Sequence, residues 1–278
     1  MSYRRIACLS TEAVETLYLL GAEDLIAGIS GYTTRPARAR KEKTKVSGFS
    51  TAKIDRILAV EPDLVVAFSD LQADIVRDLI RAGVEVHVFN QRDLAGIYRM
   101  IATLAALVDA CIEGERLIAD LQRRISDTRS RATAHSRRPR VYFEEWNDPL
   151  ISGIRWVSEL IDVTGGVDCY AEESQRGAAR DRIIADPADV IARAPDIIIA
   201  SWCGKKFQAS QMRSRTGWDA VPAVRDGELY EIKSADILSP GPAAITEGLK
   251  QLETIVERWR CSAAHTTVSI SDSPAATR

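Results

Sequence analysis

One pattern of residues occurs twice in this 278-residue chain, once in each half. Ile57–Ala67 and Val190–Ala200 each combine the end of a helix, a Pro-Asp turn and a run of aliphatic residues. The two copies are identical at four pairs of positions: Ala59 and Ala192, Pro62 and Pro195, Asp63 and Asp196, Ala67 and Ala200. Proline ends a helix, and a short aliphatic run bounded by turns is typical of a buried strand. The repeat therefore predicts two similar α/β halves.

Strands and helices alternate around both copies. The strands expected from aliphatic runs are 4–9, 25–30, 64–68, 85–89, 140–144, 196–201 and 228–232. Alternation of this kind is typical of parallel β-α-β units. The predicted fold class is α/β, with two Rossmann-like lobes whose sheets are mainly parallel.

A long helix over Ile112–Thr133 is expected between the halves. Leu117, Ile118, Leu121 and Ile125 form one apolar stripe at the helical spacing, and the other faces are mainly charged. We expect this helix to join the lobes as a rigid backbone. The predicted domains are an N-terminal lobe (1–93), a helical connector (94–136), a C-terminal lobe (137–260) and a disordered tail (261–278), which is rich in Ser, Thr and Ala.

Composition excludes several classes of function. The net charge is −2, and no apolar run approaches the ~20 residues that span a bilayer, so neither nucleic acid binding nor membrane insertion is expected. Thr11, Glu12 and Glu15 interrupt the start, which does not read as a signal peptide. The cysteines lack a C-x-x-C pair and the histidines are scattered, so we expect reduced thiols and no metal site. The chain as written is expected to be cytoplasmic, or periplasmic if a signal segment is missing from it.

Several stretches resemble one family. LSTEAVETLYLLGAEDLIAGIS, VSGFSTAKIDRILAVEPDLVVA, DPADVIARAPDIIIASWCGK and SPGPAAITEGLKQL, with two lobes joined by one helix, resemble the helical-backbone (class III) substrate-binding proteins of ABC importers. The similarity covers about residues 4–260, and its nearest branch is the vitamin B12 binders. It implies a monomer that holds cobalamin or another corrinoid between its lobes, without an intrinsic cofactor, for an ABC permease or as a cytosolic relative. A ferric siderophore and haem are the alternative ligands.

The resemblance also implies which aromatic side chains hold the ligand. Tyr32, Phe49 and Phe68 are expected to do so from the first lobe, and Trp146 and Trp202 from the second. Aromatic faces suit a large flat ligand because they bury much area and lose little conformational entropy. Packing in the local core is the alternative for each of them, and Trp156, which is followed by a helix, is expected to be a core residue.

Family members dock on their permease through one exposed carboxylate per lobe. Asp55 matches the first position and Asp189 the second, with Asp186 as a rival for the second. The alternative is that these are charges in the first turn of a helix, favoured by the helix dipole.

The chain departs from the vitamin B12 binders at one place. Arg182 stands about where they have a second-lobe tryptophan, which weakens the assignment of the ligand. A competing hypothesis is a metal-dependent enzyme that uses Glu144, Glu145 and Cys203. The sequence contains no triad motif, phosphate-binding glycine loop or HExxH motif. It therefore favours a binding protein over an enzyme.

Overall fold

The structure, a computed structural model, describes residues 3–268. By its internal contacts the chain divides into two compact units. Unit 1 contains the residues up to Arg124 together with Leu238–Thr246, and unit 2 contains Ile125–Ile237 and the residues from Glu247 onward. Within the described residues, no helix is long and apolar enough to cross a membrane.

Unit 1 is built on a five-stranded sheet in the order β3-β2-β1-β4-β5. Its strands are β1 (Ile6–Cys8), β2 (Ile26–Ser30), β3 (Thr44–Ser47), β4 (Leu64–Phe68) and β5 (Val86–Phe89). Every pairing in it is parallel. All five residues of β4 are buried, as expected for a central strand covered on both faces. The helical segments are α1 (Thr11–Leu19), η1 (Glu23–Leu25), α2 (Ala39–Glu42), α3 (Ile54–Leu58), η2 (Asp70–Gln72), α4 (Ala73–Arg81) and α5 (Leu94–Leu107).

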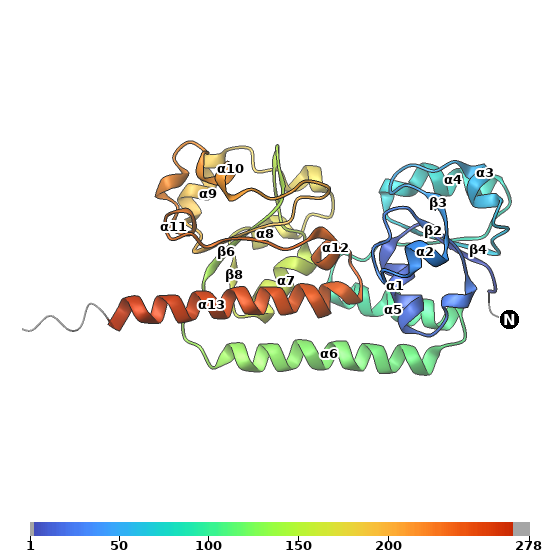
Figure 1. Ribbon diagram of the computed structural model, residues 1–278, viewed down its shortest axis with the longest axis horizontal. Helices are drawn as coiled ribbons and strands as arrows, with labels where there is room; N and C mark the ends of the chain where they lie inside the picture. Colours follow the sequence, from blue (N-terminus) through green and yellow to red (C-terminus); the bar gives the residue numbers. More distant parts are fainter. Residues whose placement is uncertain (1–2, 269–278) are drawn as a thin grey trace, which may run out of the picture. The chain divides into compact units, whose positions relative to one another are not determined.

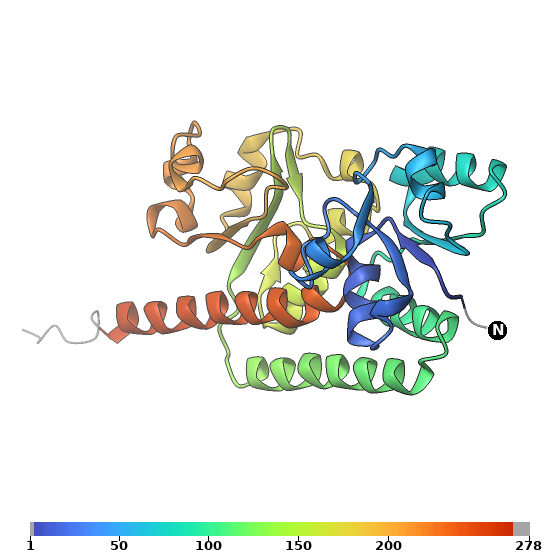
Figure 2. The same cartoon turned by 45° about the vertical axis from the view of Figure 1, so that its right-hand side comes forward.

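Unit 2 has a second sheet, in the order β10-β9-β6-β7, with β8 also paired to β6. The strands are β6 (Arg140–Asn147), β7 (Leu150–Ser152), β8 (Val167–Asp168), β9 (Ile197–Ala200) and β10 (Leu229–Glu231). Only β7 is antiparallel, and it forms a hairpin with β6 (Figure 2). The helical segments are α7 (Arg155–Val163), α8 (Ala171–Ser174), η3 (Ala179–Arg182), α9 (Pro187–Arg193), α10 (Ala209–Arg213), η4 (Trp218–Ala220), α11 (Pro222–Arg225), α12 (Ser234–Ile237), the π-helix η5 (Ala244–Gly248) and α13 (Leu249–Val268).

The aspartates of the two Pro-Asp turns make equivalent hydrogen bonds in the two units. In unit 1 the carboxylate of Asp63 accepts hydrogen bonds from the backbone amides of Arg4 (2.7 Å) and Arg5 (2.9 Å), just before β1. In unit 2 the carboxylate of Asp196 accepts one from the amide of Arg140 (2.8 Å), at the start of β6. Each aspartate thus satisfies a backbone donor that the neighbouring central strand leaves at its amino end.

The long helix is confirmed as α6 (Cys111–Thr133), drawn in green in Figure 1. A Cβ at Gly114 would lie 2.5 Å from the Cβ of Ala105, so glycine allows α6 to approach α5 closely. The division between the units falls inside α6, between Arg124 and Ile125. The predicted separate connector over 94–136 therefore differs from the observed division, because both ends of this stretch pack into a unit.

The segment Leu238–Thr246 corrects the predicted C-terminal lobe. It was expected within 137–260, but it belongs to unit 1. Three hydrogen bonds explain this placement: Thr11 Oγ1 to Ser239 Oγ (3.2 Å), Gln91 Nε2 to the carbonyl of Pro240 (2.8 Å), and the amide of Ala243 to Glu15 Oε2 (3.1 Å).

The predicted tail also needs correction. Residues 261–268 continue α13, so helical structure extends beyond the point where disorder was expected. The rest of the predicted tail, 269–278, lies outside the described residues.

Candidate functional site

The three aromatic residues expected from the first lobe lie at one edge of the unit 1 sheet. Tyr32 follows β2, Phe49 follows β3 and Phe68 is the last residue of β4. Because all strands of this sheet are parallel, these positions share its carboxyl edge. In open α/β sheets, ligands bind at that edge.

A buried glutamine holds the loops at this edge together. The side chain of Gln72 accepts a hydrogen bond from the amide of Phe68 (2.9 Å) and donates to the carbonyls of Leu9 (3.1 Å) and Phe49 (2.7 Å). It therefore joins the chain after β1, the chain after β3 and the end of β4. The sequence did not single out Gln72, because its partners Leu9 and Phe49 lie 63 and 23 positions away in the chain.

The three aromatic residues differ in the surface that they expose. Tyr32 is 63% exposed and Phe49 is 37% exposed, so both can offer ring surface to a ligand. Phe68 is only 6% exposed, and the guanidinium of Arg92 lies 5.4 Å from its ring centroid. Phe68 thus differs from the expectation of direct ligand contact, because the end of a central strand is covered by the core.

Two tryptophans lie at the carboxyl edge of the unit 2 sheet. Trp146 is near the end of β6 and Trp202 follows β9, and these strands are parallel neighbours. Trp146 is half-buried, and its indole N–H donates to the carbonyl of Asp148 (2.8 Å), which orients the ring. The ammonium of Lys205 lies over this ring, 4.6 Å from its centroid.

Trp202 is turned into the core of unit 2. It is 4% exposed, its indole N–H donates to Glu144 Oε1 (3.0 Å), and Phe207 packs edge-on against it with ring centroids 5.4 Å apart. This burial differs from the expectation that Trp202 contacts ligand. Trp156, expected in the core, is confirmed there: it is 3% exposed and donates to the carbonyl of Ile237 (2.8 Å).

Glu144 is the centre of a buried polar cluster. It is fully buried and accepts two hydrogen bonds from the guanidinium of Arg215, at 2.6 and 2.8 Å, and one from the hydroxyl of Tyr142 at 3.0 Å. Burial, then the charge of Glu144, raises the pKa of Tyr142 well above its usual value. Burial opposes the charge of Arg215, yet its bonds to Glu144 raise its pKa. Both oxygens of Glu144 are therefore committed to structure.

The neighbouring carboxylate, Glu145, is also paired. It accepts a hydrogen bond from Arg182 (2.7 Å), whose buried guanidinium also donates to the carbonyl of Ser152. The departure noted at Arg182 is thus a buried ion pair, joining residues 37 positions apart that sequence reasoning could not connect. Cys203 is exposed. Among the described residues no group of three or more His, Cys, Asp or Glu side chains is arranged to hold a metal ion.

The carboxylates expected to dock on a permease have different surroundings. Asp55 is exposed in the first turn of α3. Asp189 bonds to Arg193 (2.9 Å) and is 45% exposed at its side chain. Its charge, after burial, raises the pKa of Tyr170. Asp186 caps α9 by accepting from the amide of Ala188 (2.9 Å). Asp55 and Asp189 lie in the first turns of their helices. Their positions therefore agree with stabilisation by the helix dipole as well as with docking on a permease.

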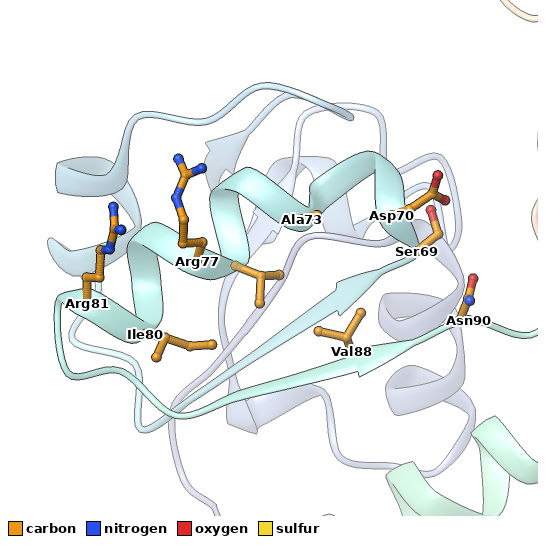
Figure 3. Close-up of a pocket in the computed structure, with 9 residues that line it drawn as sticks. Ser69, Asp70, Ala73, Arg77, Ile80, Arg81, Val88 and Asn90 are labelled. Atoms are coloured by element: carbon orange, nitrogen blue, oxygen red, sulfur yellow. The ribbon is translucent and has the colours of Figure 1, made fainter.

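A groove in unit 1 lies between α4 and β5 and has a volume of about 550 Å³. Figure 3 shows Ile80 and Val88 facing one another across it, while Arg77 and Arg81 point away. None of the residues that line it is aromatic, and Tyr32 and Phe49 are not among them. This groove is therefore distinct from the aromatic edge.

Two open α/β units with accessible aromatic rings at the carboxyl edges of their sheets, exposed in unit 1 and half-buried in unit 2, are typical of two-unit binding proteins. The chain belongs to the periplasmic binding protein family, whose model matches residues 6–235. The predicted family and fold class are confirmed.

The chain is similar to proteins from several bacteria. A vitamin B12-binding protein of Vibrio parahaemolyticus is 24% identical over 258 residues, which cover 90% of each chain. The ABC transporter substrate-binding lipoprotein YvrC of Bacillus subtilis is 23% identical, over 90% of this chain and 78% of its own. The periplasmic heme-binding protein RhuT from Roseiflexus has the same fold, with a TM-score of 0.77, 21% identity, and coverage of 92% of this chain and 100% of its own.

Proposed function

We propose that this protein is the substrate-binding component of an ABC importer and that its ligand is cobalamin or another corrinoid. The observation that carries the proposal is the set of three aromatic side chains with accessible ring surface at the carboxyl edges: Tyr32, Phe49 and Trp146. Rings that are positioned in advance suit a large flat ligand. The names of the relatives from Vibrio parahaemolyticus and Bacillus subtilis support the ligand and the transporter, respectively.

Two carboxylates of β6 argue for binding without chemical conversion of the ligand. Glu144 and Glu145, the carboxylates of the competing enzyme hypothesis, are held by Arg215 and Arg182. A carboxylate oxygen that already accepts a hydrogen bond from a guanidinium group is badly placed to take a proton from a ligand. We infer that the protein releases its ligand unchanged.

Titration of the purified protein tests the proposed ligand. Cyanocobalamin, dicyanocobinamide, haem and a ferric siderophore are added separately, and binding is followed by absorbance and by quenching of tryptophan fluorescence. We expect saturable binding of the corrinoids. Binding of the siderophore or haem alone would overturn the corrinoid assignment, and the absence of all binding would overturn the proposed function.

Substitution of the exposed aromatic residues tests the site. Tyr32→Ala and Phe49→Ala are each expected to weaken corrinoid binding by about 1–3 kcal/mol, a common range for buried aromatic anchors. Leu19→Ala is the matched control, because Leu19 is also an exposed apolar residue of unit 1 but ends α1, away from the carboxyl edge. Wild-type affinity in both aromatic variants would show that the ligand binds elsewhere.

We further propose that the protein works outside the cytoplasmic membrane, with Asp55 facing the permease. The relatives named as a lipoprotein and as a periplasmic protein support this location. Fractionation of the natural host decides the matter. Recovery in the cytosol alone would favour the cytosolic, ligand-holding relative instead.

A further inference from the structure

A lysine covers the one tryptophan that the unit 2 edge leaves accessible. Lys205 Nζ lies 4.6 Å from the ring centroid of Trp146 and donates a hydrogen bond to Asn147 Oδ1 (3.1 Å). The lysine is exposed. A cation on an aromatic face is held only weakly at an exposed site. A flat ligand that stacks on this face of Trp146 must therefore displace Lys205, and can do so at little cost.

Lys205 differs from Arg182 and Arg215 in the charge of the groups that it contacts. Arg215 is matched by Glu144 and Arg182 by Glu145, both at salt-bridge distance. The partners of Lys205 are an amide oxygen and a ring, neither of which carries a net charge. Within the described residues, no carboxylate lies within 4.0 Å of its ammonium group. This edge of unit 2 thus presents a cation that the protein itself does not neutralise.

The position of Lys205 in the chain keeps this cation near the site. It lies in the loop that follows β9, between Trp202 and Phe207. Both of these side chains pack on the core of unit 2, Trp202 within it and Phe207 against it. The loop is consequently anchored on either side of Lys205, and the flexible side chain can reorient while its backbone stays at the carboxyl edge.

We propose that Lys205, with Asn147 and Trp146, forms a subsite for an anionic group of the ligand, either a phosphate or a carboxylate. The proposal deepens the proposed function and rests on it. When the ligand covers Trp146, the ammonium group leaves the ring and pairs with the anion. Asn147 is half-buried and retains amide hydrogens that can donate to the same group. The unit 2 edge then selects flat ligands that carry an acidic substituent over neutral ones.

Pairs of ligands in which one member carries an anionic group and the other does not test the subsite. Cyanocobalamin carries a phosphodiester that dicyanocobinamide lacks, and haem carries two carboxylates that its dimethyl ester masks. Affinities are measured for wild type, Lys205→Gln, Lys205→Arg and Lys206→Gln. Lys206 is the matched control because it is the adjacent exposed lysine.

We expect Lys205→Gln to weaken binding of the anionic member of whichever pair binds by about five- to tenfold, as for loss of a partly exposed charge-assisted hydrogen bond. The neutral member should bind wild type and Lys205→Gln equally, and Lys205→Arg should retain most of the affinity. Raising the salt concentration should reduce the advantage of wild type over Lys205→Gln. A loss confined to cobalamin identifies a phosphate as the bound group, and a loss confined to haem identifies a carboxylate.

Unchanged affinity of Lys205→Gln for both anionic ligands would overturn the subsite. An equal loss for the anionic and neutral members of a pair would overturn it too, because Lys205 would then act by packing. If Lys206→Gln has the same effect as Lys205→Gln, the effect is one of general surface charge and the proposal also fails. If wild type binds none of the four ligands, the proposed function fails first and the subsite with it.

Discussion

At the scale of single residues, Glu12 is a carboxylic acid with little to stabilise its charge. It lies in the first turn of α1 and is buried, and its Oε1 has no hydrogen-bond partner among the described residues. Burial raises its pKa to about 7, and the charge of Glu15 adds to this effect, while the hydroxyls of Thr11 and Ser10 oppose it. The folded protein therefore binds a proton at Glu12 that the unfolded chain releases near pH 4.5, the ordinary value for this group.

This difference predicts a stability that depends on pH. Between about pH 4.5 and pH 7 the folded state holds more protons at Glu12 than the unfolded state, so its stabilising contribution decreases as pH rises and is lost above pH 7. Glu12→Gln removes the dependence. The free energy of unfolding of wild type, measured relative to Glu12→Gln by urea denaturation, should fall by about 3 kcal/mol from pH 5 to pH 8, at 1.36 kcal/mol per pKa unit.

The control for this experiment is Glu113→Gln, which changes an exposed glutamate in α6. It should follow wild type at every pH. If the difference between wild type and Glu12→Gln is constant from pH 5 to pH 8, Glu12 is ionised in the folded protein throughout that range, and the prediction is wrong.

At the scale of elements, the loops at the carboxyl edge of unit 1 depend on one side chain. Gln72 bonds to the backbone of Leu9, Phe49 and Phe68, which follow or end three different strands. Buried carbonyls and amides left without a partner are costly, at about 1–3 kcal/mol each. The arrangement of Phe49 is thus tied to the central strands and not only to its own loop.

Gln72→Ala is expected to weaken corrinoid binding although Gln72 is buried beneath the loops. Loss of its hydrogen bonds should destabilise the fold by about 2 kcal/mol and increase hydrogen exchange of the amides at 48–51. Gln122→Ala, at an exposed position of α6, is the control. If affinity in Gln72→Ala stays at the wild-type value while exchange increases, the loop after β3 does not position ligand contacts.

Elements with a strong local pattern could be predicted from the sequence, and those stabilised by distant partners could not. The aliphatic strands β4 and β9 and the long helix α6 follow from their own residues. The short edge strand β3, with sequence TKVS, was not among the expected strands, because valine is its only aliphatic residue. Its strand conformation comes from pairing with β2.

The same distinction applies to the candidate site. The carboxyl-edge positions of Tyr32, Phe49 and Trp146 follow from the strand that precedes or contains each of them. The burial of Trp202 depends on Glu144, a residue 58 positions away. A sequence shows that both residues exist, but a hydrogen bond between them arises only when β6 and β9 pair in the observed register.

At the scale of the whole molecule, the chain passes between the two units three times, at Arg124–Ile125, Ile237–Leu238 and Thr246–Glu247. The first passage lies inside α6 and the third inside η5, which continues into α13. The sequence-based expectation was a single passage through one helix. Bending a continuous helix breaks backbone hydrogen bonds, whereas a link made of two flexible loops could bend without losing any.

We therefore expect the radius of gyration of the wild-type protein to change little when ligand binds, by less than a hinge closure would produce. Arg124→Pro tests the cause, because proline interrupts α6 at the unit boundary at a cost of ~3 kcal/mol and leaves an exposed position otherwise unaltered. Arg124→Ala is its control, since it removes the same side chain and keeps the helix. Small-angle scattering with and without ligand should show a ligand-dependent change in Arg124→Pro that is larger than in wild type or Arg124→Ala. A wild-type change as large as that of Arg124→Pro would mean that α6 does not restrain the units, and that the other two passages act as hinges.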